Sequence, residues 1–426
     1  MFQSNRRAFL GTAAAAALTA RRLTLAASEN RPLRMGLIGC GWYGNVDLKA
    51  ALQVGGVEFI ALCDVDSDHL ESTAKETAQL QGGKTPQIFK NYQDLLDVPG
   101  LEAVIIATPP HWHALHFLAA LEKGLDIYCE KPLAYDIREG RAMVNAAKKS
   151  DRIIQIGFQR RQSQAIRAVR DYIQSGRAGK IVQADAQIHY TAGLADPTPQ
   201  DPPASLDWDL WCGPAPKIPY SPQVGHFNWR LEKTTGHGHL VDWGIHLIDT
   251  ARYVLGETVP RAVTAAGGLY QFQGKITTPD TLTAHFEFDS CPVVWRHRIW
   301  GAAEFNPEVN NGVFFFGEKA TVFVTDQQWI VIPRDPKQNR TVQTIDTDMG
   351  RNHMANFLEG VRARQQPNCP IEDGYQSTVT VQLAMIAYES GVNVAWDRAA
   401  ESVSDPRAAQ LLKREYRAPW KHPYTG

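Results

Sequence analysis

Three side chains of this sequence have the chemical types that proton transfer requires. Lys131 follows a predicted strand, and a lysine at such a position can hydrogen-bond a substrate hydroxyl group and exchange its proton. Asp242 and His246 are four residues apart, so on a helix they lie on one face. A carboxylate that orients an imidazole makes a general base near neutral pH. We therefore interpret Lys131, Asp242 and His246 as candidate catalytic residues.

Each of these patterns has a structural alternative. A lysine at a strand end is usually a solvated charge, and an Asp/His pair on a helix is often a buried structural contact. His237, His239, Asp242 and His246 could also bind a metal, but their spacing matches no zinc signature, so no metal site is predicted.

A glycine-rich turn directly follows the first apolar run. Gly39, Gly41 and Gly44 have the spacing G-x-G-x-x-G, in which the first glycine allows the tight turn, the second admits a diphosphate, and the third lets helix and strand pack closely. Asp64 ends the next apolar run, about 20 residues after Gly44, where a dinucleotide-binding unit places the carboxylate that binds the adenosine ribose. The pattern predicts a dinucleotide site.

Further residues at strand ends would complete this cofactor site. A buried strand at residues 103–107 stops at Thr108 and Pro109, and parallel strands bind ligands at their carboxyl edge. Asp64 favours NAD, because a carboxylate repels a ribose phosphate, although NADP remains possible. The predicted cofactor-binding residues are Gly39, Gly41, Trp42, Tyr43, Gly44, Asp64, Thr108, Pro109, His113, Glu130 and Lys131.

The elements that must position these residues fall into two groups. Strands and amphipathic helices alternate over residues 33–157, which predicts a Rossmann domain with a doubly wound parallel sheet. Residues 158–395 contain runs of alternating strands, which predict an α/β domain with an open, mostly antiparallel sheet. A proline-rich segment at 191–225 could line the substrate cleft or contact a second subunit, and residues 396–426 form a polar tail. The fold class is therefore α/β, with two domains.

Composition and the N-terminal sequence indicate which partners and which cellular location to expect. The chain has 426 residues and a formal net charge of -1, so no charge imbalance points to nucleic acid. The arginine pair Arg6-Arg7 precedes an alanine-rich stretch, and we interpret residues 1–30 as a twin-arginine export signal of a periplasmic protein. No membrane span is expected in the mature chain. The six cysteines show no C-x-x-C pair and are predicted to be buried free thiols, although an oxidising destination leaves disulfides open.

Aromatic and basic side chains of the second domain are candidates for binding a hydroxylated ring. Aromatic faces suit the C–H surfaces of sugars, and arginine suits hydroxyl groups or a carboxylate. Some of the aromatic residues could equally belong to the core or to an interface. The candidates are Arg160, Arg161, Tyr190, Trp229, Arg230 and His239.

Taken together, these motifs resemble the glucose-fructose oxidoreductase / inositol dehydrogenase / MocA (Gfo/Idh/MocA) family over roughly residues 33–395. The resemblance rests on Gly39-Cys40-Gly41-Trp42-Tyr43-Gly44, Thr108-Pro109-Pro110-His111-Trp112-His113, Glu130-Lys131-Pro132, Gly157-Phe158-Gln159-Arg160-Arg161 and the Asp242/His246 pair. It implies a tightly held NAD or NADP, hydride transfer at a sugar or cyclitol carbon, and a homo-oligomer, dimer or tetramer. By motif match, Lys131 corresponds to the family's lysine, with Asp242 and His246 as its acid/base partners.

Three functions remain open at this point. The leading one is a carbohydrate or cyclitol oxidoreductase in which His246 removes the hydroxyl proton, Asp242 orients His246, and Lys131 stabilises the oxygen. The alternative is an NAD-dependent glycoside hydrolase of the same superfamily, which acts by transient oxidation and elimination. The third function is a non-enzymatic sugar or nucleotide sensor, in which Lys131 and the Asp242/His246 pair would have no role.

Overall fold

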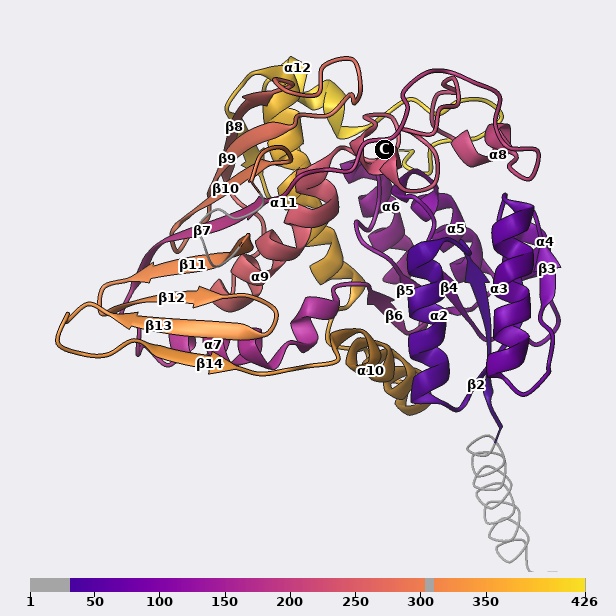
Figure 1. Ribbon diagram of the computed structural model, residues 1–426, viewed down its shortest axis with the longest axis horizontal. Coiled ribbons are helices and arrows are strands. Elements are labelled where there is room, and N and C mark those ends of the chain that lie inside the picture. Colours follow the sequence, from indigo (N-terminus) through magenta and orange to yellow (C-terminus); the bar gives the residue numbers. More distant parts are fainter. Residues whose placement is uncertain (1–30, 303–309, 426) are drawn as a thin grey trace, which may run out of the picture.

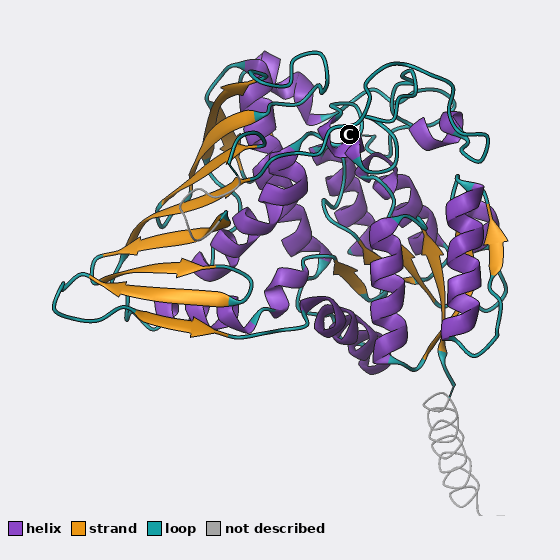
Figure 2. Cartoon of the chain, in the orientation of Figure 1, coloured by secondary structure: helices purple, strands orange, loops and turns teal. Residues whose placement is uncertain are grey.

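The computed structural model describes residues 31–302 and 310–425 (Figures 1 and 2). The expected export signal at residues 1–30 therefore lies outside the described residues. In the described part of the chain, no helix is both long and apolar enough to cross a membrane.

The first domain is built on six parallel strands in the order β3-β2-β1-β4-β5-β6, which confirms the predicted Rossmann sheet. Every residue of β4 and β5 is buried, as expected for central strands that are covered on both faces. The strands are β1 (Leu33–Ile38), β2 (Val57–Cys63), β3 (Gln87–Phe89), β4 (Ala103–Ile106), β5 (Asp126–Cys129) and β6 (Ile154–Ile156). The helices between them are α2 (Trp42–Val54), α3 (Ser67–Leu80), α4 (Tyr92–Leu96), α5 (Pro110–Glu122) and α6 (Ile137–Ala147).

Helix α5 begins within the proline pair, because Pro110 occupies its first turn. Proline is well tolerated there, since the first backbone N–H groups of a helix have no partner within the helix. His111 and His113 consequently lie within the helix.

The second domain contains a ten-stranded sheet in the order β14-β13-β12-β11-β7-β10-β9-β8-β15-β16. Among the strands of this sheet that the structure describes, only the central β7–β10 pair is parallel, so the predicted open, mostly antiparallel sheet is confirmed. The strands are β7 (Ile181–His189), β8 (Ala262–Gly268), β9 (Thr281–Glu287), β10 (Pro292–Arg298), β11 (Asn311–Gly317), β12 (Ala320–Val324), β13 (Gln328–Pro333), β14 (Thr341–Thr344), β15 (Val394–Asp397) and β16 (Ser402–Val403).

Helices cover one face of this large sheet and fill the space toward the first domain (Figure 1). They include α7 (Gln164–Gln174), α9 (Ile245–Leu255) and the long, almost fully buried α11 (Ile371–Ser390). Helix α10 (Met349–Ala363) instead packs on the first domain, because Phe357 and Leu358 share a buried cluster with Met35 and Phe59. The two domains are thus joined by apolar contacts as well as by the chain.

The segment at 191–225 and the C-terminal tail both lie against the first domain. The segment contains the short helix α8 (Trp208–Cys212), and the Asp207 backbone N–H donates to the Val65 carbonyl at 3.0 Å. The tail boundary expected after residue 395 falls inside β15, because the large sheet continues to β16. The rest of the tail contains α12 (Pro406–Ala409) and then crosses toward α8 (yellow in Figure 1).

All six cysteines are free and buried, as predicted. Burial raises the pKa of the Cys40, Cys63 and Cys129 thiols well above its usual value. These thiols are therefore protonated, and they act as small apolar side chains of the core.

Candidate active site

Lys131 and Asp242 meet where the carboxyl edge of the first sheet faces the second domain. Lys131 follows β5, whereas Asp242 lies in a π-helical turn, η3 (Leu240–Gly244), that leads directly into α9. The Lys131 Nζ donates to the Asp242 backbone oxygen at 2.7 Å and to the carboxylate Oδ1 at 3.0 Å. Both side chains are largely buried. The fold therefore places this amine and this carboxylate in one ion pair between the domains.

The structure corrects the expected partner of Asp242. The second carboxylate oxygen of Asp242 lies 3.1 Å from the Arg230 Nε, so each of the two oxygens contacts a cation. Asp242 therefore positions Lys131 and Arg230 rather than His246. Within the described residues, the His246 Nδ1 is buried and has no hydrogen-bond partner. The physical reason is charge, because a buried carboxylate gains more from two cations than from a neutral imidazole.

Burial and neighbouring charges set the protonation states at this site. Burial alone would raise the pKa of Asp242, but Lys131 and Arg230 hold it well below its usual value, so Asp242 is ionised. Burial, assisted by Lys131 and Arg160, lowers the pKa of His246 well below its usual value. His246 is therefore a neutral imidazole at neutral pH, and its unprotonated ring nitrogen can accept a hydrogen bond from a hydroxyl group.

The glycine-rich turn has the geometry of a diphosphate cradle. Gly39 has φ +99°, and a Cβ added there would lie 2.8 Å from the Ala107 carbonyl carbon. A Cβ on Gly44 would lie 1.9 Å from the Gly39 carbonyl oxygen, whereas one on Gly41 would meet nothing within 4 Å. Helix α2 starts at this open glycine without a side-chain cap, so its first N–H groups are available to an anion.

A cavity of about 460 Å³ adjoins this turn. Asp64 lines it and is fixed by two backbone amides, those of Cys40 at 2.6 Å and Asp66 at 2.9 Å. Of the predicted cofactor residues, the cavity lining includes Gly39, Gly41, Trp42, Tyr43, Asp64, Thr108 and Pro109. The open glycine, the uncapped helix and the carboxylate together fit the diphosphate and adenosine ribose of a dinucleotide.

His113 and Glu130 lie behind this lining. The His113 Nδ1 is 2.8 Å from the Pro132 carbonyl oxygen and its Nε2 is 2.7 Å from the Thr108 carbonyl oxygen, so the ring connects the loops after β4 and β5. Glu130 accepts hydrogen bonds from the Gln159 side chain at 2.7 Å and from the Lys131 backbone N–H at 3.1 Å. Both residues therefore hold the loops that carry the site in position.

We expect Glu130→Gln to change the pH dependence of folding stability. Burial raises the pKa of Glu130 to about 7, although Lys131 opposes this shift. The folded state then binds the proton more tightly than the unfolded chain, whose glutamate has a pKa of about 4.3, so wild-type stability falls as pH rises through this window. The free energy of unfolding by urea, measured for both proteins at about pH 5 and about pH 8, tests this. The wild type should lose stability relative to the variant at the higher pH, and a constant difference would contradict the expectation.

Four of the substrate candidates lie close to the ion pair. Besides Arg230, Tyr190 and His239 are adjacent, with the Tyr190 hydroxyl 3.3 Å from the His239 Nδ1. Burial lowers the pKa of His239 well below its usual value, and the His239 Nε2 is buried without a hydrogen-bond partner among the described residues. Arg160 Cζ lies 4.9 Å from the centre of the Trp243 ring, which itself is 6.0 Å from the His246 ring.

Two side chains beside Arg160 were not predicted. Trp243 directly follows Asp242, and its position in the same motif could have identified it. Asp326, whose Oδ1 lies 3.0 Å from the Arg160 Nε, follows β12 in a turn far along the chain. No local signal identifies this pairing, because it depends on the large sheet. Within the described residues, the Arg160 Nη1 is buried and has no hydrogen-bond partner.

Arg230 links the cavity to the ion pair, because it lines the cavity with Trp229 and also contacts Asp242. The Arg230 Cζ lies 4.3 Å from the centre of the Trp229 ring. Trp229 is also part of a buried aromatic cluster with Trp208 and Trp211. Trp229 therefore has the core role that the sequence left open, as well as a face toward the cavity.

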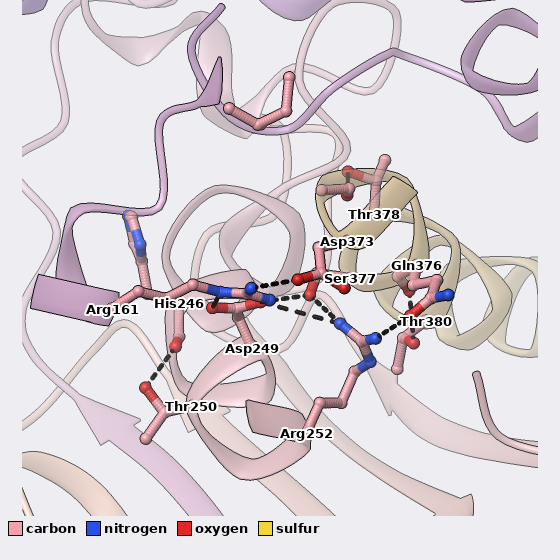
Figure 3. Close-up of polar contacts among 12 residues, drawn as sticks. Arg161, His246, Asp249, Thr250, Arg252, Asp373, Gln376, Ser377, Thr378 and Thr380 are labelled. Carbon is pink, nitrogen blue, oxygen red and sulfur yellow. Dashed lines mark hydrogen bonds and ion pairs between the residues drawn. The ribbon is translucent and has the colours of Figure 1, made fainter. Parts of the chain in front are cut away.

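Arg161 lies among polar and charged side chains of α9 and α11 (Figure 3). Its guanidinium donates to the Asp249 carboxylate at 2.9 and 2.7 Å and to the Asp373 carboxylate at 2.6 Å. Asp249 also pairs with Arg252 and accepts a hydrogen bond from Ser377. The structure does not support the expected substrate-binding role of Arg161. Its guanidinium is instead paired within a buried network that joins α9 and α11.

In the two described stretches, the groups of side chains with metal-ligand spacing are Asp66/His69/His226 and Asp136/Glu139/His422. Neither includes the His237, His239, Asp242 and His246 set considered from the sequence. Asp66 and His226 instead form a pair at 2.8 Å that connects α3 to the segment after α8.

Comparison with family models assigns both halves of the chain. Residues 33–158 match the family described as "Oxidoreductase family, NAD-binding Rossmann fold", and residues 185–422 match "Oxidoreductase family, C-terminal alpha/beta domain". The second match alone covers more than half of the chain.

Curated relatives and solved structures agree with this assignment. The D-glucoside 3-dehydrogenase of Escherichia coli (strain K12) is 24% identical over 71% of this chain and 74% of its own length. The levoglucosan dehydrogenase of Pseudarthrobacter phenanthrenivorans is 32% identical, but the match spans only 39% of this chain and 36% of that enzyme. A solved levoglucosan dehydrogenase, in complex with NADH and levoglucosan, has a TM-score of 0.69 with 19% identity, covering 85% of this chain and 99% of that one. At this identity the structural match shows a shared fold.

Proposed function

Because the chain belongs to the Gfo/Idh/MocA family of oxidoreductases, we propose that it transfers a hydride between a tightly held NAD and a carbohydrate or cyclitol. The observation that carries the proposal is the meeting of Lys131 and Asp242 beside the cavity with the glycine cradle. Bound NAD supplies the acceptor and donor of the hydride.

The chain's own residues supply the proton transfer and the positioning. In this proposal, neutral His246 accepts the proton of the substrate hydroxyl group, and the Lys131 ammonium stabilises the oxygen as negative charge develops. Asp242 holds Lys131 and Arg230 at fixed distances, so neither cation must reorganise during the reaction. Asp242 is thus a positioning residue in this scheme, as well as the counter-charge of the site.

A polyhydroxylated ring suits the polar groups around the ion pair. Arg160 Nη1 and His239 Nε2 are buried hydrogen-bonding atoms without a partner in the described part of the chain. Buried polar atoms of this kind are costly unless a ligand satisfies them. The aromatic face of Trp243 could pack against the C–H groups of such a ring. Support for this substrate class also comes from relatives named as glucoside, inositol and levoglucosan dehydrogenases.

The test begins with the nucleotide that stays bound during purification, identified by mass spectrometry. The loaded protein is then mixed with neutral hexoses, inositols and aryl glycosides, and NADH fluorescence and released aglycone are followed together. Formation of NADH, or hydride exchange between two sugars, supports the proposal. Release of the aglycone without net NADH favours the redox-assisted hydrolase, and no reaction with any member of the panel would refute the substrate class. A titration in which NADPH binds more tightly than NADH would contradict the choice of NAD.

The cellular setting and the assembly are further parts of the proposal. A protein that folds around a nucleotide before export needs a route for folded cargo, so we propose the twin-arginine route and a periplasmic location. A reporter fused after residue 30 should then leave the cytoplasm.

In β9, exposed His285 and Glu287 alternate with buried Ala284 and Phe286, and we propose the solvent side of this large sheet as the surface of a homo-oligomer. Light scattering of the purified protein measures its mass.

A further inference from the structure

The C-terminal segment at residues 413–425 leaves the second domain and is anchored to the first. The Arg414 Nε donates to the buried Glu139 carboxylate at 2.8 Å, and its Nη2 donates to the His111 carbonyl oxygen at 2.8 Å. The Tyr416 hydroxyl donates to the same carboxylate at 2.8 Å. Glu139 lies in α6 and His111 in α5, so the start of this segment is fixed to two helices of the Rossmann domain.

Further anchors follow along the segment. The Arg417 Nη1 donates to the Asp209 carboxylate at 2.8 Å, and its Nε donates to the Gly213 carbonyl oxygen at 3.0 Å. These contacts fix the segment to α8 (Figure 1). The His422 Nε2 lies 3.0 Å from the Asp136 carboxylate. The chain between Arg417 and His422 is therefore held at both ends.

Trp420 lies in this held stretch and lines the same cavity as Asp64 and Thr108. Its ring meets the Trp112 ring edge to face, with centres 5.7 Å apart and an interplanar angle of 88°. Trp112 is in turn fixed by hydrogen bonds from its indole N–H to two carbonyl oxygens of α8 and by stacking on His116 at 4.8 Å. Trp112 of the first domain and Trp420 of the C-terminal segment thus build one aromatic wall of the cavity.

We infer that residues 413–425 form a strap that retains the cofactor, with Trp420 as a contact of its adenosine half. The inference rests on the proposed function for the identity of the occupant, NAD, and goes beyond it by assigning the retention to particular residues. Asp64, which suits the adenosine ribose, lines the cavity together with Trp420, and an aromatic wall suits a purine base. In this inference, release of the dinucleotide past this wall requires Trp420 to move, which breaks the flanking contacts of Arg417 or His422.

The test measures how fast NADH leaves the full-length protein. Protein loaded with NADH is mixed with excess NAD, and the loss of bound NADH fluorescence gives the release rate. Trp420→Ala should release NADH about 10- to 100-fold faster, the range expected when an aromatic contact to a base is removed. Trp420→Phe keeps an aromatic face and should stay near the wild-type rate. Tyr270→Ala, which removes an exposed aromatic ring that lies outside the strap and is not part of the cavity lining, is the matched control and should release NADH as the wild type does.

A chain that ends at Leu412 provides the second test, with its melting temperature as a check on folding. If it folds, it should release NADH at least as fast as Trp420→Ala. The inference is overturned if Trp420→Ala releases NADH at the wild-type rate, whether or not the truncated chain folds. These measurements contain no sugar, so they are independent of whether the protein oxidises one. Slow release of NADH by a protein that oxidises no sugar would support the strap and refute the proposed function.

Discussion

Replacing Lys131 with methionine is expected to lower kcat for the substrate by about 10²- to 10³-fold, the usual contribution of a donor that stabilises developing negative charge. Methionine keeps the length of the side chain but removes the ammonium that lies 3.0 Å from Asp242. Asp242 retains Arg230 as a counter-charge, so the site should stay folded. The rate of NADH formation in a single turnover, with the cofactor already bound, measures this loss.

Controls separate this effect from a general loss of charge or of folding. Lys123→Met removes an exposed lysine of the same domain, whose ion pair with Asp97 lies at the surface, and should leave kcat unchanged. NADH release from Lys131→Met should stay within a few-fold of wild type, because the cavity with the glycine cradle is untouched. If Lys131→Met turns over at the wild-type rate, Lys131 takes no part in the reaction.

Replacing Arg161 with methionine is expected to lower the free energy of unfolding by about 3 kcal/mol, the lower end of the usual cost of removing one partner of a buried ion pair, because Arg252 stays 3.7 Å from Asp249. Arg161 is the main bidentate partner of the Asp249 carboxylate, and both side chains are almost fully buried. The counter-charge also keeps the pKa of Asp249 low, in spite of burial. Urea unfolding measures the loss, and KM of the variant that remains folded should equal the wild-type value.

Arg160→Met is the matched comparison, because the two arginines are adjacent and both are buried. Arg160 pairs with Asp326, which is partly open to solvent, so its removal should cost less stability. If Arg160 binds substrate, KM should rise in Arg160→Met and not in Arg161→Met. Equal effects of the two changes on KM, with equal losses of stability, would contradict this division of roles.

The different roles of Arg160 and Arg161 cannot be predicted from a local sequence pattern. Both belong to one motif and have the same chemistry, so the sequence gives no reason to separate them. Their partners, Asp326 for one and Asp249 for the other, come from a turn of the large sheet and from α9. Only the packing of these distant elements decides which arginine faces the site.

What the sequence determined by itself is the part of the protein governed by short-range rules. The glycine spacing requires backbone conformations and approaches that other residues cannot provide, and the structure shows them at Gly39 and Gly44. Hydrophobic periodicity likewise predicted the parallel first sheet and the antiparallel second one, because burial on one or both faces leaves a pattern in the residues themselves.

Tertiary structure decided the features that depend on long-range contact. Asp242 pairs with Lys131 and Arg230 instead of His246, and a tail without a recognisable pattern places Trp420 in the wall of the cofactor cavity. The contacts of Lys131 with Asp242 and of Arg417 with Asp209 join residues 111 and 208 positions apart, and their energy comes from charge pairing and burial. No spacing rule within a single element encodes them, so they become visible only when the domains are packed together.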